Sequence, residues 1–402
     1  ALFARRPRQY LHAERIASPD RAAIGRVGTM TCTDDAISRF TCIIPAGGVG
    51  SRLWPLSRAN APKFLLDLTG SGTSLLRATW DRLTPLVGAD RIMVVTGNAH
   101  SPSVLEQLPE LSPGNLVTEN EPKDSSAAIG LAAAILERRD PNAIVGSFAA
   151  DHVIRGTVLF ERAVRTAVRA ADQGYIATIG IHPTEPSTGF GYIESGEARG
   201  DIAPFDVYDV RQFVEKPDEE TARDYLSRGD FLWNAGMFIA RASVLLDQMA
   251  LADPQMVADL REIAAAWETD RAAAVRERLW PALPKIAIDY TVAEPAAARG
   301  KMVCVAAHFE WDDVGDFASV ATLLTRGRSS DLAVLGDGAQ VLSDGSSGIV
   351  VSESNRLVAL VGVENVVVVD TADVLLVTTK DRAQDVKNLV NRMRLSGGGH
   401  LL

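Results

Sequence analysis

Short apolar runs alternate with amphipathic stretches along the first part of the chain. The pattern predicts strands at 40–45, 91–96, 115–118 and 143–148, and helices near 74–87, 101–108, 125–138 and 157–172. Strands that alternate with helices in this way are typical of a parallel sheet with helices on its faces. Ligands of such sheets bind beyond the carboxyl ends of the strands, so we expect the functional site there.

Further strands are predicted at 175–181, 207–215 and 231–240, with a short helix from Asp218 and helices through about 242–280. After Asp331 the pattern changes to short valine-rich runs punctuated by Gly, Ser and Asp, which favours a small β-helix or β-roll over a plain β-meander. Residues 381–393 are typical of a closing helix. We therefore expect an α/β fold, in which a Rossmann-like, mostly parallel sheet at 37–328 precedes a β-helix-like domain at 329–395.

The chain has 402 residues, of which 47% are hydrophobic and 23% charged, and its net charge is -10. This acidic balance argues against binding to nucleic acid or to an anionic membrane surface, because both need a dense basic surface. No apolar run approaches the roughly 18 residues of a membrane span. The three cysteines, Cys32, Cys42 and Cys304, form no CxxC pair and suggest neither a disulfide framework nor a zinc site, which fits the cytoplasm.

The first thirty residues are rich in arginine and poor in apolar anchors. We expect residues 1–36 to be a disordered extension, or the region before Met30 to be an over-extended start. A transit peptide or basic anchor is the alternative.

A glycine-rich segment, AGGVGSRLWPLSRANAPK at 46–63, follows the first predicted strand. An ordinary turn does not need Arg52, Trp54, Arg58 and Lys63 at fixed offsets, whereas a triphosphate needs fixed positive charge. The spacing matches neither GxxxxGK[ST] nor GxGxxG. We predict a triphosphate-binding loop in which glycines let backbone N–H groups approach the anion, formed by Ala46, Gly47, Gly48, Gly50 and Ser51.

Two aspartates that each follow a strand are candidate magnesium ligands. Asp151 lies in SFAADHVI and Asp313 in WDDVGDF, with Asp312 as the less favoured neighbour. A lone aspartate in this position is usually a cap or turn residue. A nucleoside triphosphate, however, needs Mg²⁺, which takes oxygen ligands from one or two carboxylates and from phosphates. His152 beside Asp151 is not needed as a general base, because a phosphate monoester is already anionic.

The string GGVGSRLWPLSR followed by Pro62 and Lys63 resembles the signature of sugar-1-phosphate nucleotidyltransferases. Its WPLSR ending is similar to the mannose-1-phosphate guanylyltransferase branch, and the resemblance extends from about Thr41 to about Lys387. It implies that Asp151 and Asp313 bind Mg²⁺. It further implies catalytic roles for three cations, namely Arg52, Lys63 and Lys216.

The resemblance also implies which segments read the substrates. The nucleotide would meet ENEPKDSSAAIG, where Ser-Ser departs from the usual Thr-Ala and simple helix capping is the alternative. Its candidate residues are Glu121, Pro122, Ser125 and Ser126. The sugar would meet FGYIES, VEKP, WNAGMF and AIDY, although Asp289 could instead cap a helix that begins near Tyr290. The sugar-side candidates are Gly191, Glu215, Asn234, Gly236 and Asp289.

The activity that the resemblance implies is transfer of GMP from GTP to α-D-mannose 1-phosphate by in-line attack, without a covalent intermediate. The products would be GDP-mannose and pyrophosphate. The alternatives are another pair, such as glucose 1-phosphate with dTTP or UTP, and a noncatalytic subunit that senses nucleotide sugars. A Rossmann dehydrogenase is disfavoured because GxGxxG is missing from the first turn. We also expect a homodimer. Isomerase activity is not expected, since the six histidines are scattered along the chain.

Overall fold

The computed structural model describes residues 32–204, 206–326 and 331–402. Most of the expected N-terminal extension, residues 1–31, lies outside the described residues. Its expected end at residue 36 is wrong, because residues 32–36 belong to helix α1 (Cys32–Ser38). Ala36 in this helix is buried in the same hydrophobic core as residues of α5 (Thr157–Asp172), so α1 packs on the domain.

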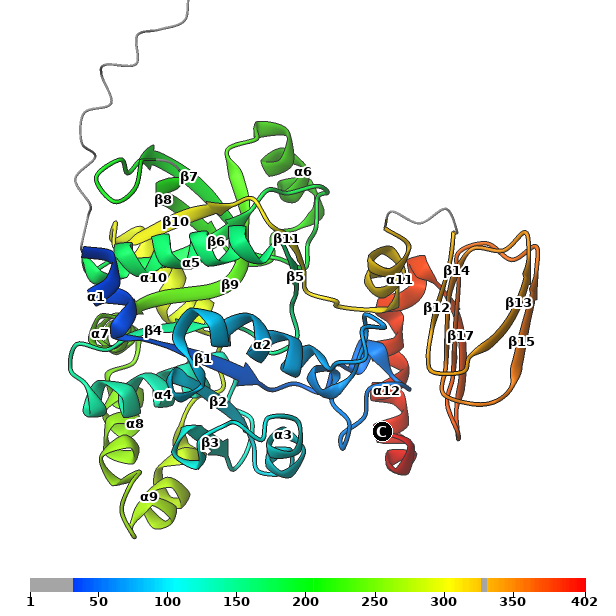
Figure 1. Cartoon of the computed structure of the whole chain (residues 1–402), viewed down its shortest axis with the longest axis horizontal. Coiled ribbons are helices and arrows are strands. Elements are labelled where there is room, and N and C mark those ends of the chain that lie inside the picture. Colours follow the sequence, from blue (N-terminus) through cyan, green and yellow to red (C-terminus); the bar gives the residue numbers. More distant parts are fainter. Residues whose placement is uncertain (1–31, 205, 327–330) are drawn as a thin grey trace, which may run out of the picture.

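A nine-stranded sheet forms the centre of the large domain (Figure 1). In spatial order its strands are β3 (Leu116–Glu119), β2 (Ile92–Gly97), β1 (Phe40–Ala46), β4 (Ile144–Ser147), β9 (Phe231–Arg241), β6 (Ile176–Ile181), β10 (Met302–Ala307), β8 (Val207–Val214) and β7 (Tyr192–Ala198). β1 to β4 are parallel, as expected. The sheet as a whole is mixed, because β9 runs antiparallel to both β4 and β6, and β7 and β8 are antiparallel to each other.

Helices cover both faces of this sheet. Alternate residues of β1 supply the two cores: Cys42 and Ile44 pack with α2 (Leu75–Val87), α3 (Ser101–Gln107) and α5, whereas Ile43 packs on the opposite side. That second core contains α4 (Ser125–Arg139), α7 (Ala242–Ala252), α8 (Pro254–Ala266) and α10 (Glu294–Ala298), and α9 (Ala272–Leu279) packs on α8. In the described ranges, no helix is both long and apolar enough to cross a membrane.

Three elements of the large domain are small and were not anticipated in detail. β5 (Val153–Arg155) and β11 (Glu310–Asp312) form an antiparallel ribbon apart from the main sheet. A π-helix spans Asp289–Ala293 and leads into α10, where a helix near Tyr290 was expected. The expected short helix after Asp218 is α6 (Glu219–Arg228), which Asp218 caps by accepting from the Thr221 N–H at 2.8 Å.

The C-terminal strands stack as a β-helix rather than a meander. They are β12 (Leu332–Leu335), β13 (Gln340–Asp344), β14 (Gly348–Ser352), β15 (Leu357–Val361), β16 (Val366–Asp370) and β17 (Leu375–Thr379). β12, β14 and β16 pair in parallel, as do β13 and β15, whereas β17 closes the stack in antiparallel orientation. Gly348 has φ 127°, and a Cβ there would overlap the carbonyl oxygen of Val366 on the next coil, so only glycine fits this corner.

Helices α11 (Phe317–Thr325) and α12 (Val386–Leu395) lie between the large domain and the β-helix (Figure 1). They share a third core with Ile349 and Val367 of the β-helix and with Leu53 and Trp54, which follow the glycine-rich loop. The expected boundary near residue 328 is therefore not a break in packing. The phosphate-loop segment and the C-terminal domain are built around the same apolar core.

Candidate active site

The glycine-rich loop leaves β1 at Ala46 and enters a short 3₁₀ helix at Ser51–Leu53. The carbonyl of Ala46 is fixed because the hydroxyl of Thr96 on β2 donates to it at 2.8 Å. Gly50 has φ 76°, and a Cβ there would lie 2.6 Å from Cβ of Lys63, so glycine lets the lysine stem pass against the loop. Across the described part of the chain, the backbone N–H groups of residues 48–50 donate to no acceptor.

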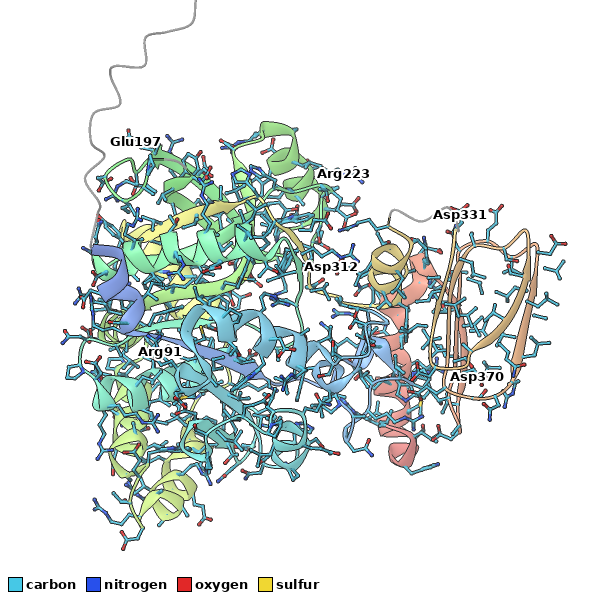
Figure 2. All side chains as sticks on the ribbon, in the orientation of Figure 1. Arg91, Glu197, Arg223, Asp312, Asp331 and Asp370 are labelled. Atoms are coloured by element: carbon cyan, nitrogen blue, oxygen red, sulfur yellow. The ribbon has the colours of Figure 1, made fainter. Side chains whose placement is uncertain are left out.

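Lys63 lies at the centre of the candidate site. Its side chain is buried, and its ammonium group donates to the Asp151 carboxylate at 2.7 Å and to the backbone carbonyl of Asp313. The β5–β11 ribbon explains this convergence, since it pairs Val153 with Asp312 and so places the residues on either side of that pair together. Figure 2 shows Asp312 on the segment between the large domain and α11.

The pKa values of the two candidate metal ligands are shifted in opposite directions. Burial would raise the pKa of Asp151, but the Lys63 ammonium outweighs it and holds that pKa below its usual value. The pKa of Asp313 rises to about 6, first because the carboxyl is buried and further because Asp312 and Asp151 lie nearby. A cation between these carboxylates would relieve their repulsion, and Lys63 supplies one positive charge in that position.

This donor set fits Mg²⁺ in its chemistry. Among the described residues, no group of three or more His, Cys, Asp or Glu side chains could hold a metal ion. A magnesium ion bound by one or two carboxylates keeps its other ligands from water and substrate phosphates, so two aspartates are sufficient.

The predicted sugar-side residues form one contiguous group. The Glu215 carboxylate is buried and paired with the Lys216 ammonium, while the Lys216 side chain is 59% exposed. Burial alone would lower the pKa of Lys216, but the adjacent Glu215 carboxylate outweighs it and raises that pKa. A Cβ on Gly191 would lie 2.5 Å from Oε2 of Glu215, so the absence of a side chain gives the carboxylate its place.

Asn234 connects this group to the rest of the site. Its amide nitrogen donates to Asp289 at 3.0 Å, and its amide oxygen accepts from the Thr178 hydroxyl at 3.1 Å and from the Gly236 N–H at 3.1 Å. The pKa of Asp289 rises to about 6, mainly through burial and then through the Glu215 carboxylate. Asp289 is the first residue of the π-helix, and its carboxylate accepts from Asn234. It thus starts a helix and also contacts the sugar-side group.

The nucleotide segment is only partly available to a ligand. Glu121 and Pro122 are exposed, and the Glu121 carboxylate is paired with Lys123 at 2.9 Å. The hydroxyl of Ser125 accepts from the N–H of Ile288 at 2.9 Å, which ties the start of α4 to the π-helix region. Ser126 is fully buried and its hydroxyl bonds Thr291 at 2.7 Å, so it holds the π-helix rather than facing a nucleotide.

Sequence reasoning missed Glu119, the last residue of β3. Glu119 is 8% exposed, and its Oε1 has no hydrogen-bond partner among the residues that the structure describes. Burial, together with the Asp124 carboxylate, raises the pKa of Glu119 to about 7. A buried, unpaired carboxylate at the carboxyl end of a strand is a strong signal for a ligand contact. The sequence shows only that Glu119 ends a predicted strand, and the nearby pair of Glu121 and Pro122 was the more conspicuous candidate.

The cations of the signature segment divide into two groups. The guanidinium of Arg52 makes no ion pair or hydrogen bond with any described residue and is free to meet an anion. Arg58, by contrast, pairs with Asp373 of the C-terminal domain at 2.9 Å, and the indole of Trp54 donates to the Leu401 carbonyl at 2.7 Å. Trp54 and Arg58 therefore hold the loop against the C-terminal domain.

Comparison with known proteins identifies the class. Residues 41–326 match the Nucleotidyl transferase family, and the chain belongs to it. Residues 339–393 match the MannoseP isomerase/GMP-like beta-helix domain, in agreement with the stacked C-terminal strands.

Individual proteins that are similar to this chain include mannose-1-phosphate guanylyltransferases. The Xanthan biosynthesis protein XanB of Xanthomonas campestris pv. campestris is 38% identical over 361 residues, which are 88% of this chain and 73% of that protein. A mannose-1-phosphate guanylyltransferase of Klebsiella pneumoniae is 36% identical over 355 residues, with the same two coverages of 88% and 73%. A crystal structure from Thermus thermophilus, described as a mannose-1-phosphate geranyltransferase, has a TM-score of 0.77 at 29% identity and covers 89% of this chain and 99% of its own.

Proposed function

We propose that this protein transfers GMP from GTP to α-D-mannose 1-phosphate and releases GDP-mannose and pyrophosphate. The observation that carries the proposal is the convergence of Lys63, Asp151 and Asp313 beside a glycine-rich loop in which the N–H groups of residues 48–50 donate to no described residue. The names of the relatives, mannose-1-phosphate guanylyltransferases among them, support the choice of substrates.

Catalysis would consist mainly of positioning and charge stabilisation, as in other phosphoryl-type transfers. The free loop N–H groups and the unpaired Arg52 guanidinium would hold the β- and γ-phosphates and stabilise the departing pyrophosphate. Lys63 would contact the α-phosphate, and the exposed ammonium of Lys216 would hold the phosphate of the incoming sugar. A sugar-phosphate oxygen would then attack the α-phosphorus in line, and the P–O bond to pyrophosphate would break.

Asp151 and Asp313 would hold Mg²⁺. The ion would supply positive charge to the substrate phosphates in the transition state. Lys63, whose ammonium donates to the Asp151 carboxylate, would add its own positive charge beside the substrate phosphates. Both aspartates would therefore have to be ionised, which the Lys63 charge favours.

Glu119 would select guanine. The N1–H and the exocyclic amino group of guanine are adjacent donors, and a carboxylate accepts two such bonds side by side. Adenine offers a donor beside an acceptor at the corresponding edge, and it would leave the buried carboxylate unsatisfied. On the sugar side, the carboxylates of Glu215 and Asp289 would accept hydrogen bonds from hydroxyl groups, and the amide nitrogen of Asn234 would donate one.

The test is pyrophosphate release by the purified full-length chain with Mg²⁺, measured for GTP, ATP, UTP and dTTP against mannose and glucose 1-phosphates. We expect the highest kcat/KM for GTP with mannose 1-phosphate. A preference for dTTP or UTP with glucose 1-phosphate would refute the specificity. No release with any pair, together with binding of a nucleotide sugar, would favour the sensing subunit instead.

We also propose that the protein acts in the cytoplasm as a homodimer. The buried free thiols of Cys42 and Cys304 fit a reducing compartment. Size-exclusion chromatography with light scattering would measure the molar mass in solution and test the dimer. The mass of a single chain at micromolar concentration would contradict it.

A further inference from the structure

His152 and Trp311 are joined by a hydrogen bond that fixes the state of the histidine. The indole nitrogen of Trp311 lies 3.2 Å from Nδ1 of His152, and the two rings meet edge to face with centroids 5.3 Å apart. An indole N–H can only donate, so Nδ1 must be the acceptor. The imidazole is therefore neutral, and its single proton is on Nε2.

The position of Trp311 is itself well defined. It lies on β11, where it pairs with Ile154 of β5, and its ring contacts Phe190 with centroids 5.1 Å apart. Phe190 in turn packs on Trp233 at 5.0 Å. Packed aromatic rings of this kind leave the indole little freedom, so the donor that orients His152 is held in place before any substrate binds.

The imidazole of His152 lies next to residues of both halves of the site. Nε2 contacts no acceptor among the described residues. It is not completely buried, so a ligand can reach it. A Cβ built on Gly236 would be 3.9 Å from Cε1 of His152, so the ring stands beside a residue without a side chain. Asp151 precedes His152 in the chain, and the Gly236 N–H bonds Asn234 on the sugar side.

We propose that the Nε2–H of His152 donates to the C2 hydroxyl of the sugar phosphate and makes His152 a determinant of sugar specificity. The proposal rests on the proposed function. C2 is bonded to the anomeric carbon that carries the phosphate, so its hydroxyl is the ring hydroxyl nearest the phosphate and the Asp151 side of the site. In mannose this hydroxyl is axial and in glucose equatorial, and the bare Gly236 leaves room for the axial group.

The first experiment compares mannose 1-phosphate with its 2-deoxy analogue, which lacks the hydroxyl. For the wild-type chain, kcat/KM should be roughly tenfold lower with the analogue, as for loss of one hydrogen bond in a closed site. His152→Phe keeps a ring but has no donor, so it should lose a similar factor with mannose 1-phosphate and almost nothing with the analogue. The KM for GTP should not change.

Two further variants distinguish the effect of the indole hydrogen bond, which sets the His152 tautomer, from the effect of altered aromatic packing. Trp311→Phe keeps an aromatic ring but removes the indole donor, so it should weaken discrimination between the two sugars. Trp267→Phe, at the end of α8, is the matched control: its ring contacts Arg276 rather than His152, so it should discriminate between the two sugars as the wild type does. Equal losses with both sugars in His152→Phe would overturn the proposal, as would a wild-type chain that does not distinguish them. Absence of activity in the wild type would instead refute the proposed function.

A second measurement does not depend on activity. In the full-length chain labelled with ¹⁵N-histidine, the ring nitrogen shifts report which atom carries the proton, and the His152→Phe spectrum assigns the signal. We expect a neutral ring protonated at Nε2 in the wild type and a mixture of tautomers in Trp311→Phe. A wild-type ring protonated at Nδ1 would overturn the inference.

Discussion

Replacement of Lys63 by methionine tests the centre of the site without a large change in shape. The lysine side chain is 9% exposed and its ammonium is 2.7 Å from the Asp151 carboxylate, which is 30% exposed. Methionine preserves most of the apolar stem but removes the charge and all donors. Breaking a buried ion pair from one side costs about 3–5 kcal/mol, and we expect about 3 kcal/mol because Asp151 retains partial contact with solvent.

The pH dependence distinguishes this explanation from simple loss of packing. In the wild type the pKa of Asp151 is lowered, so its stabilising contribution is present above the pKa of the unfolded chain and is lost as pH falls through the folded value. In Lys63→Met the effect of burial is no longer opposed by the lysine charge, so we expect the pKa of Asp151 to be higher than in the wild type. The cost of the substitution should therefore shrink as pH is lowered from about 7 to about 5, where the carboxyl can bind a proton.

The assay is urea unfolding of both proteins at the two pH values, with Lys301→Met as an exposed control. The control should change the free energy of unfolding by less than about 0.5 kcal/mol. A cost for Lys63→Met that is the same at both pH values would show that lost packing dominates. A negligible cost at neutral pH would refute the ion pair as a stabilising element.

Three further predictions address other parts of the molecule. Arg52→Ala should lower turnover at least about a hundredfold, and a near-normal kcat would exclude the guanidinium from leaving-group stabilisation. Glu119→Gln should raise KM for GTP but not for the sugar phosphate. Because the pKa of Glu119 is raised from 4.5 to about 7, the wild type loses stability as pH rises between these values, and the substitution should flatten this fall in the free energy of unfolding. Gly348→Ala should destabilise the β-helix strongly in thermal unfolding. Gly338→Ala, also at positive φ but in open space, should be mild, and equal effects would contradict a clash between coils.

Much of the fold could be predicted because its strands are buried runs of apolar residues. The run predicted at 40–45 is β1 at Phe40–Ala46, and the run predicted at 175–181 is β6 at Ile176–Ile181. Strand direction was less predictable. The antiparallel β9 has the same apolar character as its parallel neighbours, and only the path of the chain decides its orientation.

The site was predictable where a motif is local and unpredictable where distant segments meet. Asp151 and Asp313 were selected by their motifs, but the ribbon that joins them has only three residues in each strand, β5 and β11, and no periodicity to detect. The contact that Arg58 makes could not be predicted either, because its partner Asp373 is far along the chain.

The third core makes the β-helix unsuitable as an exchangeable module. Leu53 and Trp54 lie within a few residues of the phosphate-loop glycines, yet they pack with Ile349 and Val367. A chimera that takes its C-terminal domain from another nucleotidyltransferase would face mismatched side chains directly behind Arg52. Such a graft would have to carry residues 53–58 with it, so these two distant stretches of sequence form a single unit for protein engineering.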